Sequence, residues 1–165
     1  MSELLEKLSS YNLFNYLFPG VVFSLLVDRF FSYSLIQEDI VVGVFLYYFV
    51  GLVISRLGSL FVEPILKRIG FITFSDYSDF IIASKSDPKI ETLLEVNNMY
   101  RTVVALFFSL ALIAIYQVIK SKWPIVTNYS VYITIFFLFI MFVYSYRKQT
   151  SYIVKRIDSS KESTN

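Results

Sequence analysis

Three long runs of residues that carry no charge constrain this chain more than any other feature. They are Ile40 to Ser55, Thr102 to Ile119 and Trp123 to Tyr146. A helix needs about 20 mostly apolar residues to cross the hydrocarbon core of a bilayer. We therefore predict transmembrane helices at 102–119 and 123–146, and a third at 40–62 in which Arg56 reaches the interface with its charged head.

A fourth span is predicted at 13–33, where the sequence is less regular. Pro19 removes a backbone hydrogen bond, so we expect this first span to be kinked or broken. The charged pair Asp28 and Arg29 lies in the same stretch. Charges within a membrane are costly and often functional, which makes this intramembrane pair a candidate site. The alternative is that both residues lie at the outer interface and pair with water, lipid headgroups or each other.

The composition agrees with a membrane protein. Of the 165 residues, 56% are hydrophobic and 17% are charged, whereas soluble domains average about 25% charged residues. A chain this short has too little volume to hide so much apolar surface in a water-soluble core. We predict an all-α fold with a single polytopic domain over 1–165. It would be an integral membrane four-helix bundle with short amphipathic and cytoplasmic helical extensions.

Basic residues predict how the helices are oriented. The loop at 34–39 has none, whereas the segment at 57–100 and the tail at 147–165 are rich in lysine and arginine. The positive-inside rule places both of these segments, and both termini, in the cytoplasm of a multi-pass membrane protein. Leucines at helical spacing also predict a short interfacial helix within 1–12.

The segment at 57–100 is far longer than an ordinary connection and carries its own helix signals. Asp87 followed by Pro88 is typical of a helix start, and a helix that begins there can continue to Ile119. A loop that folds must cover its apolar residues with the membrane face, a neighbouring subunit or a soluble partner. We expect a cytoplasmic protein partner to bind here. The candidate partner-binding residues are Tyr77, Phe80, Asp87, Glu91 and Glu95. The alternative for the acidic residues is a solvated helix face.

Small residues recur at helical spacing on the second span. Gly51, Ser55 and Ser59 are spaced at successive helical turns, and Gly58 lies beside them. Such a stripe lets helix backbones approach closely. One interpretation is a homo-oligomer interface, with a tetramer favoured because homo-oligomers adopt closed symmetry. The other interpretation is packing within one subunit.

The sequence offers no catalytic, cofactor-binding or metal site. It has no cysteine and no histidine, which removes thiolate ligands, the commonest metal ligand and the commonest general base. Hydrolase and nucleotide-binding motifs are missing too, so we expect no enzymatic activity. The net charge of +2 is too small to predict direct nucleic-acid binding. Five basic residues of the cytoplasmic side could form an anion site for phosphate groups or a nucleotide: Lys67, Arg68, Lys85, Lys89 and Arg101. The alternative is that they make ordinary contact with anionic lipid.

In overall plan the chain resembles the small four-span membrane proteins of bacterial anti-phage defence systems, such as the membrane subunit of the Kiwa system and the four-span effectors of cyclic-nucleotide signalling. The resemblance covers the whole chain and rests on its short length, four spans, modest cytoplasmic loop and lack of a catalytic motif. The segment from Tyr11 to Gly20 also looks like the opening of many small bacterial membrane proteins. The resemblance implies a sensor or effector embedded in a bacterial inner membrane, which acts with a cytoplasmic partner or a nucleotide signal. The alternatives are a small stand-alone channel or transporter, and a passive scaffold for a soluble partner.

Overall fold

The computed structural model describes residues 10–31 and 33–162. This part of the chain is 87% helix and contains no strand, which confirms the predicted all-α class. Four helices are long and apolar enough to cross a membrane: Leu13–Phe31, Ile40–Arg68, Lys89–Lys122 and Ile125–Ser159. Each of them overlaps one of the four predicted spans. The interfacial helix predicted within 1–12 falls almost entirely outside the described residues.

The first two spans share an unusual construction. In each, a π-helix of five residues interrupts the α-helix. The first span comprises η1 (Leu13–Leu17) and α3 (Phe18–Phe31), and α2 (Ser10–Asn12) leads into it. The second comprises α4 (Ile40–Leu57), η2 (Gly58–Val62) and α5 (Glu63–Arg68). The chain therefore passes through a wider turn once in each of these spans.

A proline accounts for each π-helix. Pro19 and Pro64 both lie two residues beyond the end of a π-helix. A proline ring clashes with the carbonyl four residues earlier, and a locally wider turn moves that carbonyl out of the way. Helices in lipid tolerate proline through such adjustments. The bend expected at Pro19 is thus taken up by a π-helical turn, and the helix continues beyond it.

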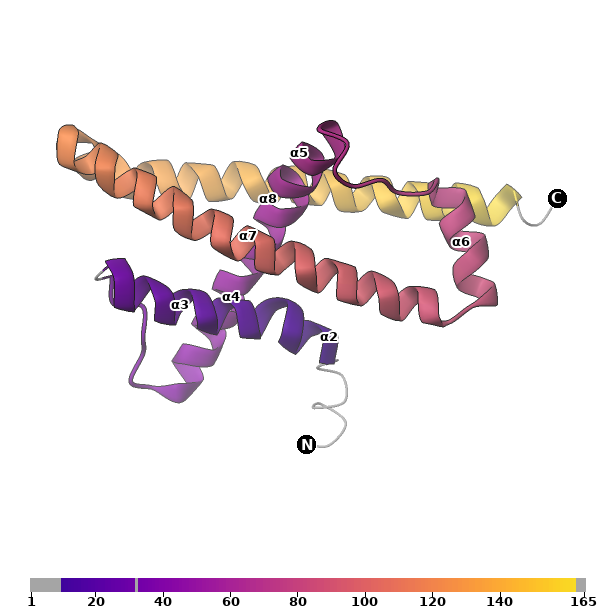
Figure 1. Cartoon of the computed structure of the whole chain (residues 1–165), viewed down its shortest axis with the longest axis horizontal. Coiled ribbons are helices and arrows are strands. Elements are labelled where there is room, and N and C mark those ends of the chain that lie inside the picture. Colours follow the sequence, from indigo (N-terminus) through magenta and orange to yellow (C-terminus); the bar gives the residue numbers. More distant parts are fainter. Residues whose placement is uncertain (1–9, 32, 163–165) are drawn as a thin grey trace.

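The last two spans form a long hairpin (Figure 1). α7 (Lys89–Lys122) and α8 (Ile125–Glu162) meet at a corner made by Trp123 and Pro124. α7 begins where the sequence predicts a helix start, because the Asp87 carboxylate accepts a hydrogen bond from the first amide of the helix at 3.0 Å. α8 continues as a helix through most of the stretch that the sequence assigned to a tail.

A shorter helix, α6 (Tyr77–Ser86), joins the ends of α7 and α8 that lie away from the corner. The rings of Tyr77 and Tyr152 stack with their centroids 6.1 Å apart, which fixes α6 against α8. We call α6, residues 89–100 of α7 and residues 149–162 of α8 the helical extension. In Figure 1 it lies at the end of the molecule opposite the corner, where α6 runs between the separated ends of α7 and α8.

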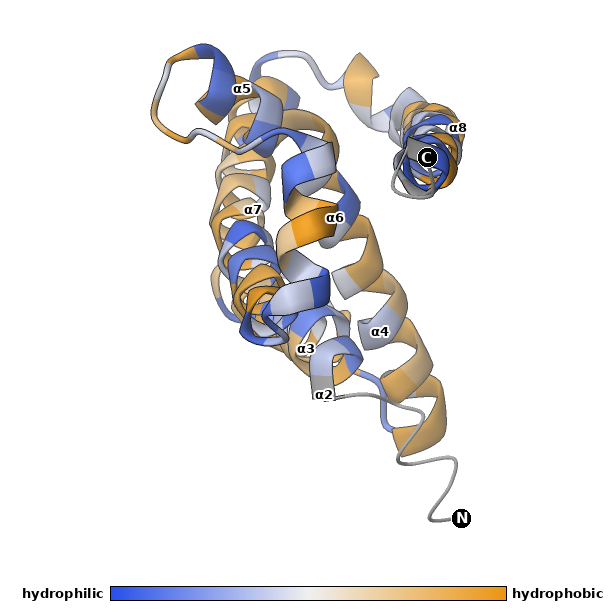
Figure 2. Ribbon diagram, turned by 90° about the vertical axis from the view of Figure 1, so that its right-hand side faces the viewer, coloured by the Kyte–Doolittle hydropathy of each residue, from blue (hydrophilic) through white to orange (hydrophobic). Residues whose placement is uncertain are grey.

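Helices α3, α4 and α7 pack together, whereas α8 lies apart. The buried core cluster is formed by Ile54, Val62, Ala105 and Leu106, which come from α4, η2 and α7. In Figure 2, α8 is seen end-on at one side of the molecule, and α4 crosses diagonally beside α3 and α7. Only 6% of the most apolar window of α8 is buried, against 22% to 28% in the other three spans. Most of the apolar surface of α8 is therefore not covered by the other helices.

Two glycines set how closely the first two spans approach. A Cβ atom added to Gly51 would overlap the backbone carbonyl of Tyr16, and one added to Gly20 would overlap the carbonyl of Tyr47. Because both obstacles are backbone atoms, neither can move aside by changing a side-chain rotamer. The crossing of η1 and α3 with α4 therefore requires glycine at both positions.

Candidate functional site

A buried carboxylate, Glu63, holds three cations together at the end of the second span. Its Oε2 atom lies 2.7 Å from Nη1 of Arg101, and its Oε1 atom lies 3.4 Å from Nζ of Lys148 and 3.7 Å from Nζ of Lys67. We call these four residues the Glu63 cluster. Glu63 is only 7% exposed, and a charge buried to this degree is stable only when it is paired. Because Arg101 belongs to α7 and Lys148 to α8, the cluster joins three spans.

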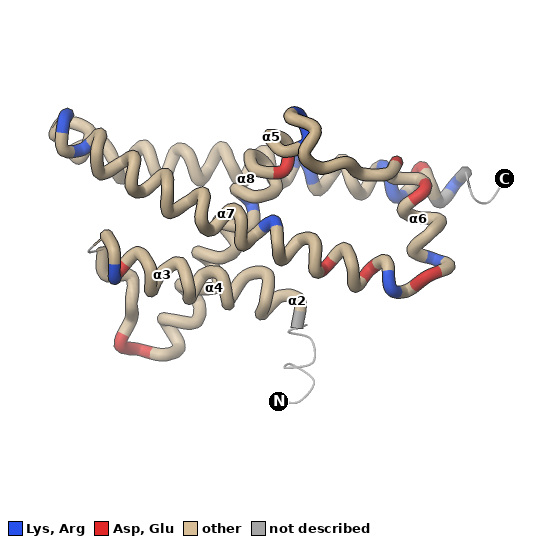
Figure 3. The backbone as a smooth tube through the Cα atoms, viewed as in Figure 1, with Lys and Arg blue, Asp and Glu red and all other residues tan. Residues whose placement is uncertain are grey.

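The Glu63 cluster marks the level at which the apolar parts of the spans end. The uncharged run of α7 begins directly after Arg101, that of α8 ends directly before Arg147, and that of α4 ends before Arg56. Figure 3 shows further charges along the helical extension beyond this level. The cluster therefore lies between an apolar layer, which contains the spans, and the charged extension.

Lys148 also donates to a backbone carbonyl that lacks a helical donor. Its Nζ atom lies 2.8 Å from the carbonyl oxygen of Ser59 and 2.8 Å from the hydroxyl of the same residue. At the end of η2 the amide of Glu63 donates to the carbonyl of Gly58, five residues back. In this register the next amide would serve the Ser59 carbonyl, but the next residue is Pro64, which has no N–H. The lysine supplies the missing donor.

A second polar layer lies beside the cluster, on its apolar side. Asn15, Ser55 and Thr102 are each at most 1% exposed, and they come from η1, α4 and α7. The Thr102 hydroxyl lies 2.8 Å from Oδ1 of Asn15 and 3.3 Å from the Ser55 hydroxyl. The Asn15 amide in turn donates to Ser55 at 3.4 Å. Because buried polar groups need partners, this network fixes the three helices relative to one another.

The buried network continues outward through Tyr11. The Tyr11 hydroxyl accepts hydrogen bonds from the side-chain amides of Asn15 and Asn98, both at 3.3 Å. Burial, followed by the nearby phenol of Tyr16, raises the pKa of Tyr11 above its usual value, so the phenol stays neutral. Arg56 donates to the Tyr16 hydroxyl at 3.3 Å. Polar contacts thus run without a break from α2 to α4 and α7.

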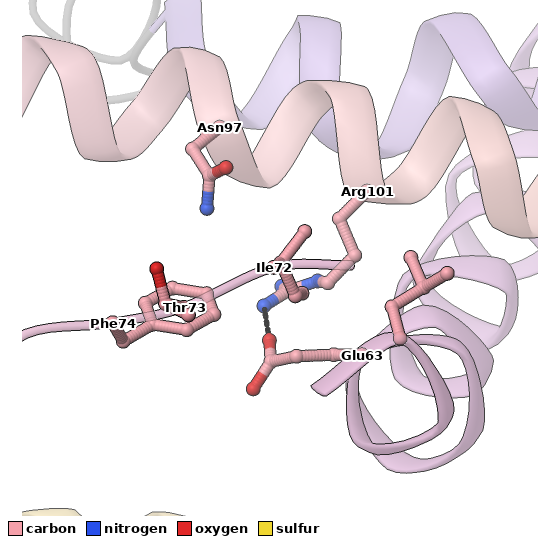
Figure 4. Close-up of a pocket in the computed structure, with 7 residues that line it drawn as sticks. Glu63, Ile72, Thr73, Phe74, Asn97 and Arg101 are labelled. Carbon is pink, nitrogen blue, oxygen red and sulfur yellow. Dashed lines mark hydrogen bonds and ion pairs between the residues drawn. The ribbon is translucent and has the colours of Figure 1, made fainter. Parts of the chain in front are cut away.

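A cavity of about 220 Å³ opens beside the Glu63 cluster. Its walls are α5, the segment at 71–76 and α7, and its lining residues are Glu63, Leu66, Ile72, Thr73, Phe74, Asn97 and Arg101. Figure 4 shows Glu63 bonded to Arg101 at one side of the cavity, and the side chains of Asn97 and Thr73 directed into the space between α7 and the loop. The cavity therefore combines a guanidinium group and the carboxylate bonded to it with neutral polar groups.

The structure places the small-residue stripe of the second span inside the chain. Gly51, Ser55, Gly58 and Ser59 are all buried. Gly51 lies against the backbone of η1, and a Cβ on Gly58 would lie 3.1 Å from the Cβ of Ala105 on α7. The stripe is thus used for packing within one subunit, and it presents no outer face to a second copy.

The charged pair predicted in the first span lies far from the Glu63 cluster. Asp28 is half-buried and Arg29 is exposed, and neither forms an ion pair within the described residues. Both lie in the last turn of α3, whose final carbonyl, that of Phe31, accepts a hydrogen bond from Gln117 near the corner. The pair therefore sits at the opposite end of the spans, at the level of the corner.

The predicted partner-binding residues divide into two groups. Tyr77 and Phe80 are half-buried and face one another on α6, with their ring centroids 6.3 Å apart. Tyr77 also stacks on α8, so these aromatic side chains serve packing within the extension. Asp87, Glu91 and Glu95 are exposed on or beside the first turns of α7. The acidic residues are the part of the predicted surface that remains open to a partner.

Sequence analysis did not identify the Glu63 cluster or the buried network as units. One signal was available for the cluster, because Glu63 is the only carboxylate between Ile40 and Leu66 and stands directly before a proline. Lys148, in contrast, is one of several basic residues of the last helix, and nothing in its neighbourhood marks it as buried. Comparison with protein families, characterised proteins and solved structures finds no match for this chain.

Proposed function

We propose that this protein is a sensor or effector subunit of a bacterial anti-phage defence system, embedded in the inner membrane and acting with a cytoplasmic partner or signal. The observation that carries the proposal is the connection between the helical extension and the spans. Arg101 lies where α7 leaves the apolar layer and Lys148 lies where α8 does, and both bind Glu63. A displacement of the extension would therefore reach three spans through one buried charge cluster.

The attachment of α8 supports a switching role. Within the described residues, Lys148 makes every hydrogen bond and ion pair that ties α8 to the other spans. The rest of the contact is apolar, including the stacked rings of Phe49 and Phe142 and those of Phe61 and Phe137. A ligand that binds one of two arrangements more tightly shifts the population between them. A partner on the extension would thus change where α8 lies in the membrane.

A channel or transporter that acts alone has weaker support. Selective transport needs polar groups along a path through the spans. The buried groups of Asn15, Ser55 and Thr102 bond to each other at one end of the spans. Further along α7, the buried Ser109 hydroxyl donates to the carbonyl of Ala105 in its own helix at 2.7 Å. These contacts favour a structural role for the polar side chains in the apolar layer.

The proposal places the extension and both termini in the cytoplasm, because the segments 57–100 and 147–165 carry most of the lysines and arginines of the chain. It also includes a closed homo-oligomer, with a tetramer favoured. The contact surface between copies must differ from the stripe that contains Gly51 and Ser55, since that stripe is buried in each subunit. The exposed carboxylates of Glu91 and Glu95 are the proposed contact for a cytoplasmic protein.

Charge reversal on the extension tests this proposal. The gene and its chromosomal neighbours are expressed in a sensitive host, and the plating efficiency of a phage panel is measured. We expect the native protein to protect and the double variant Glu91→Lys with Glu95→Lys to lose protection at an unchanged membrane level. The matched control is Lys120→Glu with Lys122→Glu, which reverses two charges at the corner and should leave protection intact.

Two outcomes would count against the proposal. If the native protein protects against no phage in the panel, the defence role is wrong. If the Glu91 and Glu95 double variant protects as well as the native protein, the partner does not bind the acidic side of α7.

A further inference from the structure

The cavity beside the Glu63 cluster has the chemistry of a phosphate site. Its volume of about 220 Å³ exceeds several times the roughly 30 Å³ that one water molecule occupies in the liquid. It therefore has room for a phosphate group together with adjoining atoms. Its walls come from α5, α7 and the loop between α5 and α6, so that a bound group would touch three segments of the chain.

Arg101 is the main recognition group of this cavity. Its Nη1 atom is bonded to Glu63 at 2.7 Å, and its side chain lines the cavity. A guanidinium group presents its N–H donors in a planar fork that matches phosphate oxygens. The Asn97 amide and the Thr73 hydroxyl point into the same space (Figure 4) and add two neutral donors.

The charges around the cavity favour an anion. Three cations, Lys67, Arg101 and Lys148, surround the single carboxylate of Glu63, which leaves two positive charges uncompensated. The Lys67 ammonium also lies 4.0 Å from the ring centroid of Phe74, a residue that lines the cavity. A phosphate group in the cavity would neutralise charge that the protein itself leaves unpaired.

The position of the cavity points to where such a phosphate comes from. The Glu63 cluster lies at the level where the uncharged runs of the spans end, which is the depth of the lipid headgroups. Basic pockets between transmembrane helices at this depth are suited to anionic headgroups. The same donors would also accept the phosphate of a soluble ester that enters from the side of the extension.

We propose that the cavity bounded by Arg101, Asn97 and Thr73 is a binding site for a phosphate group, presented by an interfacial lipid or by a soluble phosphate ester. A bound phosphate would fasten the loop between α5 and α6 to α7. It would also hold Arg101 and Lys67 in their places around Glu63. The proposal concerns a ligand of the chain itself and holds whether or not the protein acts in phage defence.

The test measures binding to the full chain in a neutral maltoside detergent. Native mass spectrometry counts the bound molecules of dioctanoyl phosphatidylglycerol, and dioctanoylglycerol, which lacks the phosphate, is the matched lipid. The soluble ligands tested are glycerol phosphate and inorganic phosphate, and their binding is measured as a shift in the temperature of thermal unfolding. We expect one phosphatidylglycerol to bind and the neutral lipid not to bind.

Variants of one exposed residue locate the site without disturbing the buried cluster. Asn97→Asp places a negative charge at the cavity and should weaken phosphate binding about tenfold, whereas Asn97→Lys should strengthen it. Asn128→Asp makes the same chemical change at an exposed position near the corner and should leave binding unchanged. The thermal unfolding of each unliganded variant shows whether its fold is intact.

Each result decides the proposal. If the Asn97 variants change the binding of phosphatidylglycerol, the site is assigned to a lipid headgroup. If they change only the binding of the soluble phosphates, it is assigned to a soluble ester. The proposal is overturned if both lipids bind equally and neither soluble phosphate binds. It is also overturned if Asn97→Asp and Asn128→Asp bind every phosphate ligand as the native chain does.

Discussion

The ammonium of Lys148 lies 2.8 Å from the carbonyl oxygen of Ser59, an oxygen that would otherwise have no donor because Pro64 follows in the π-helical register. This contact joins α8 to η2. The carbonyl left without a donor in the second span therefore determines where α8 is attached. It also connects the helix that contributes least to the core with the buried carboxylate of Glu63.

Replacing this lysine should loosen the molecule. Lys148→Met keeps most of the side-chain length but leaves the Ser59 carbonyl without a donor and Glu63 with one cation fewer. We expect the free energy of unfolding to fall by about 2 kcal/mol, as for the loss of a hydrogen bond to a charged group. Denaturant titration of the purified protein in detergent measures the change. Lys155→Met, at an exposed position of the same helix, is the control. Equal stability of the two variants would show that Lys148 is not a structural tie.

The close crossing of the first two spans gives a second prediction. Gly51→Ala introduces a methyl group that overlaps the carbonyl of Tyr16, so the helices must move apart. We expect a cost of about 1–3 kcal/mol, the usual range for an overpacked core. Gly43→Ala is the matched control, because its new Cβ would meet only the ring of Tyr47 at 3.2 Å. The two variants are compared by thermal unfolding in the same detergent. Equal stability of Gly51→Ala and Gly43→Ala would contradict the close approach of the first two spans.

The buried network predicts coupling between two residues that are distant in sequence. Asn15→Leu and Thr102→Val each remove one partner of the 2.8 Å hydrogen bond between η1 and α7. Each single change should destabilise the protein, and the double change should cost less than their sum by about 1 kcal/mol. Ser109→Ala, paired with Asn15→Leu, should be additive, since Ser109 bonds only within its own helix. Additivity of Asn15 and Thr102 would show that they do not interact in the folded protein.

Topology provides a fourth prediction. Reporter fusions in the loop between α5 and α6 and after Glu162 should both report the cytoplasm, whereas a fusion in the loop at 34–39 should report the opposite side. Alkaline phosphatase and green fluorescent protein fusions give opposite signals on the two sides and check each other. A signal from outside the cytoplasm at either site of the first pair would overturn the assigned orientation.

The elements of this fold were largely predictable, because their causes are local. Uncharged runs of residues predict three of the spans, and the long, mostly apolar stretch at 13–33 predicts the fourth. Asp87 with Pro88 predicts the start of α7, which the structure confirms through the bond from its first amide. Proline was correctly identified as a disturbance in the first span. Its result was a π-helical turn instead of a break, since the wider turn removes the clash while keeping the helix.

The site was not predictable in the same way, because it depends on which helices lie side by side. Lys148 and Ser59 are 89 residues apart, and no pattern in the sequence pairs them. The small-residue stripe shows the same limit. Spacing at Gly51 and Ser55 indicates close approach of a helix, but it does not say whether that helix belongs to the same chain. In the structure it does, because η1 and α7 cover the stripe.

The distribution of the core along the chain has a consequence for biosynthesis. Every residue of the buried core cluster, and every apolar residue packed against it, precedes Leu110 or is Leu110 itself. All residues of this cluster are therefore synthesised before α8, and the first three spans can pack around it. The last helix then adds the buried Met141, its stacked aromatic rings and Lys148 to that unit. The order of synthesis thus matches the order in which the helices can pack together.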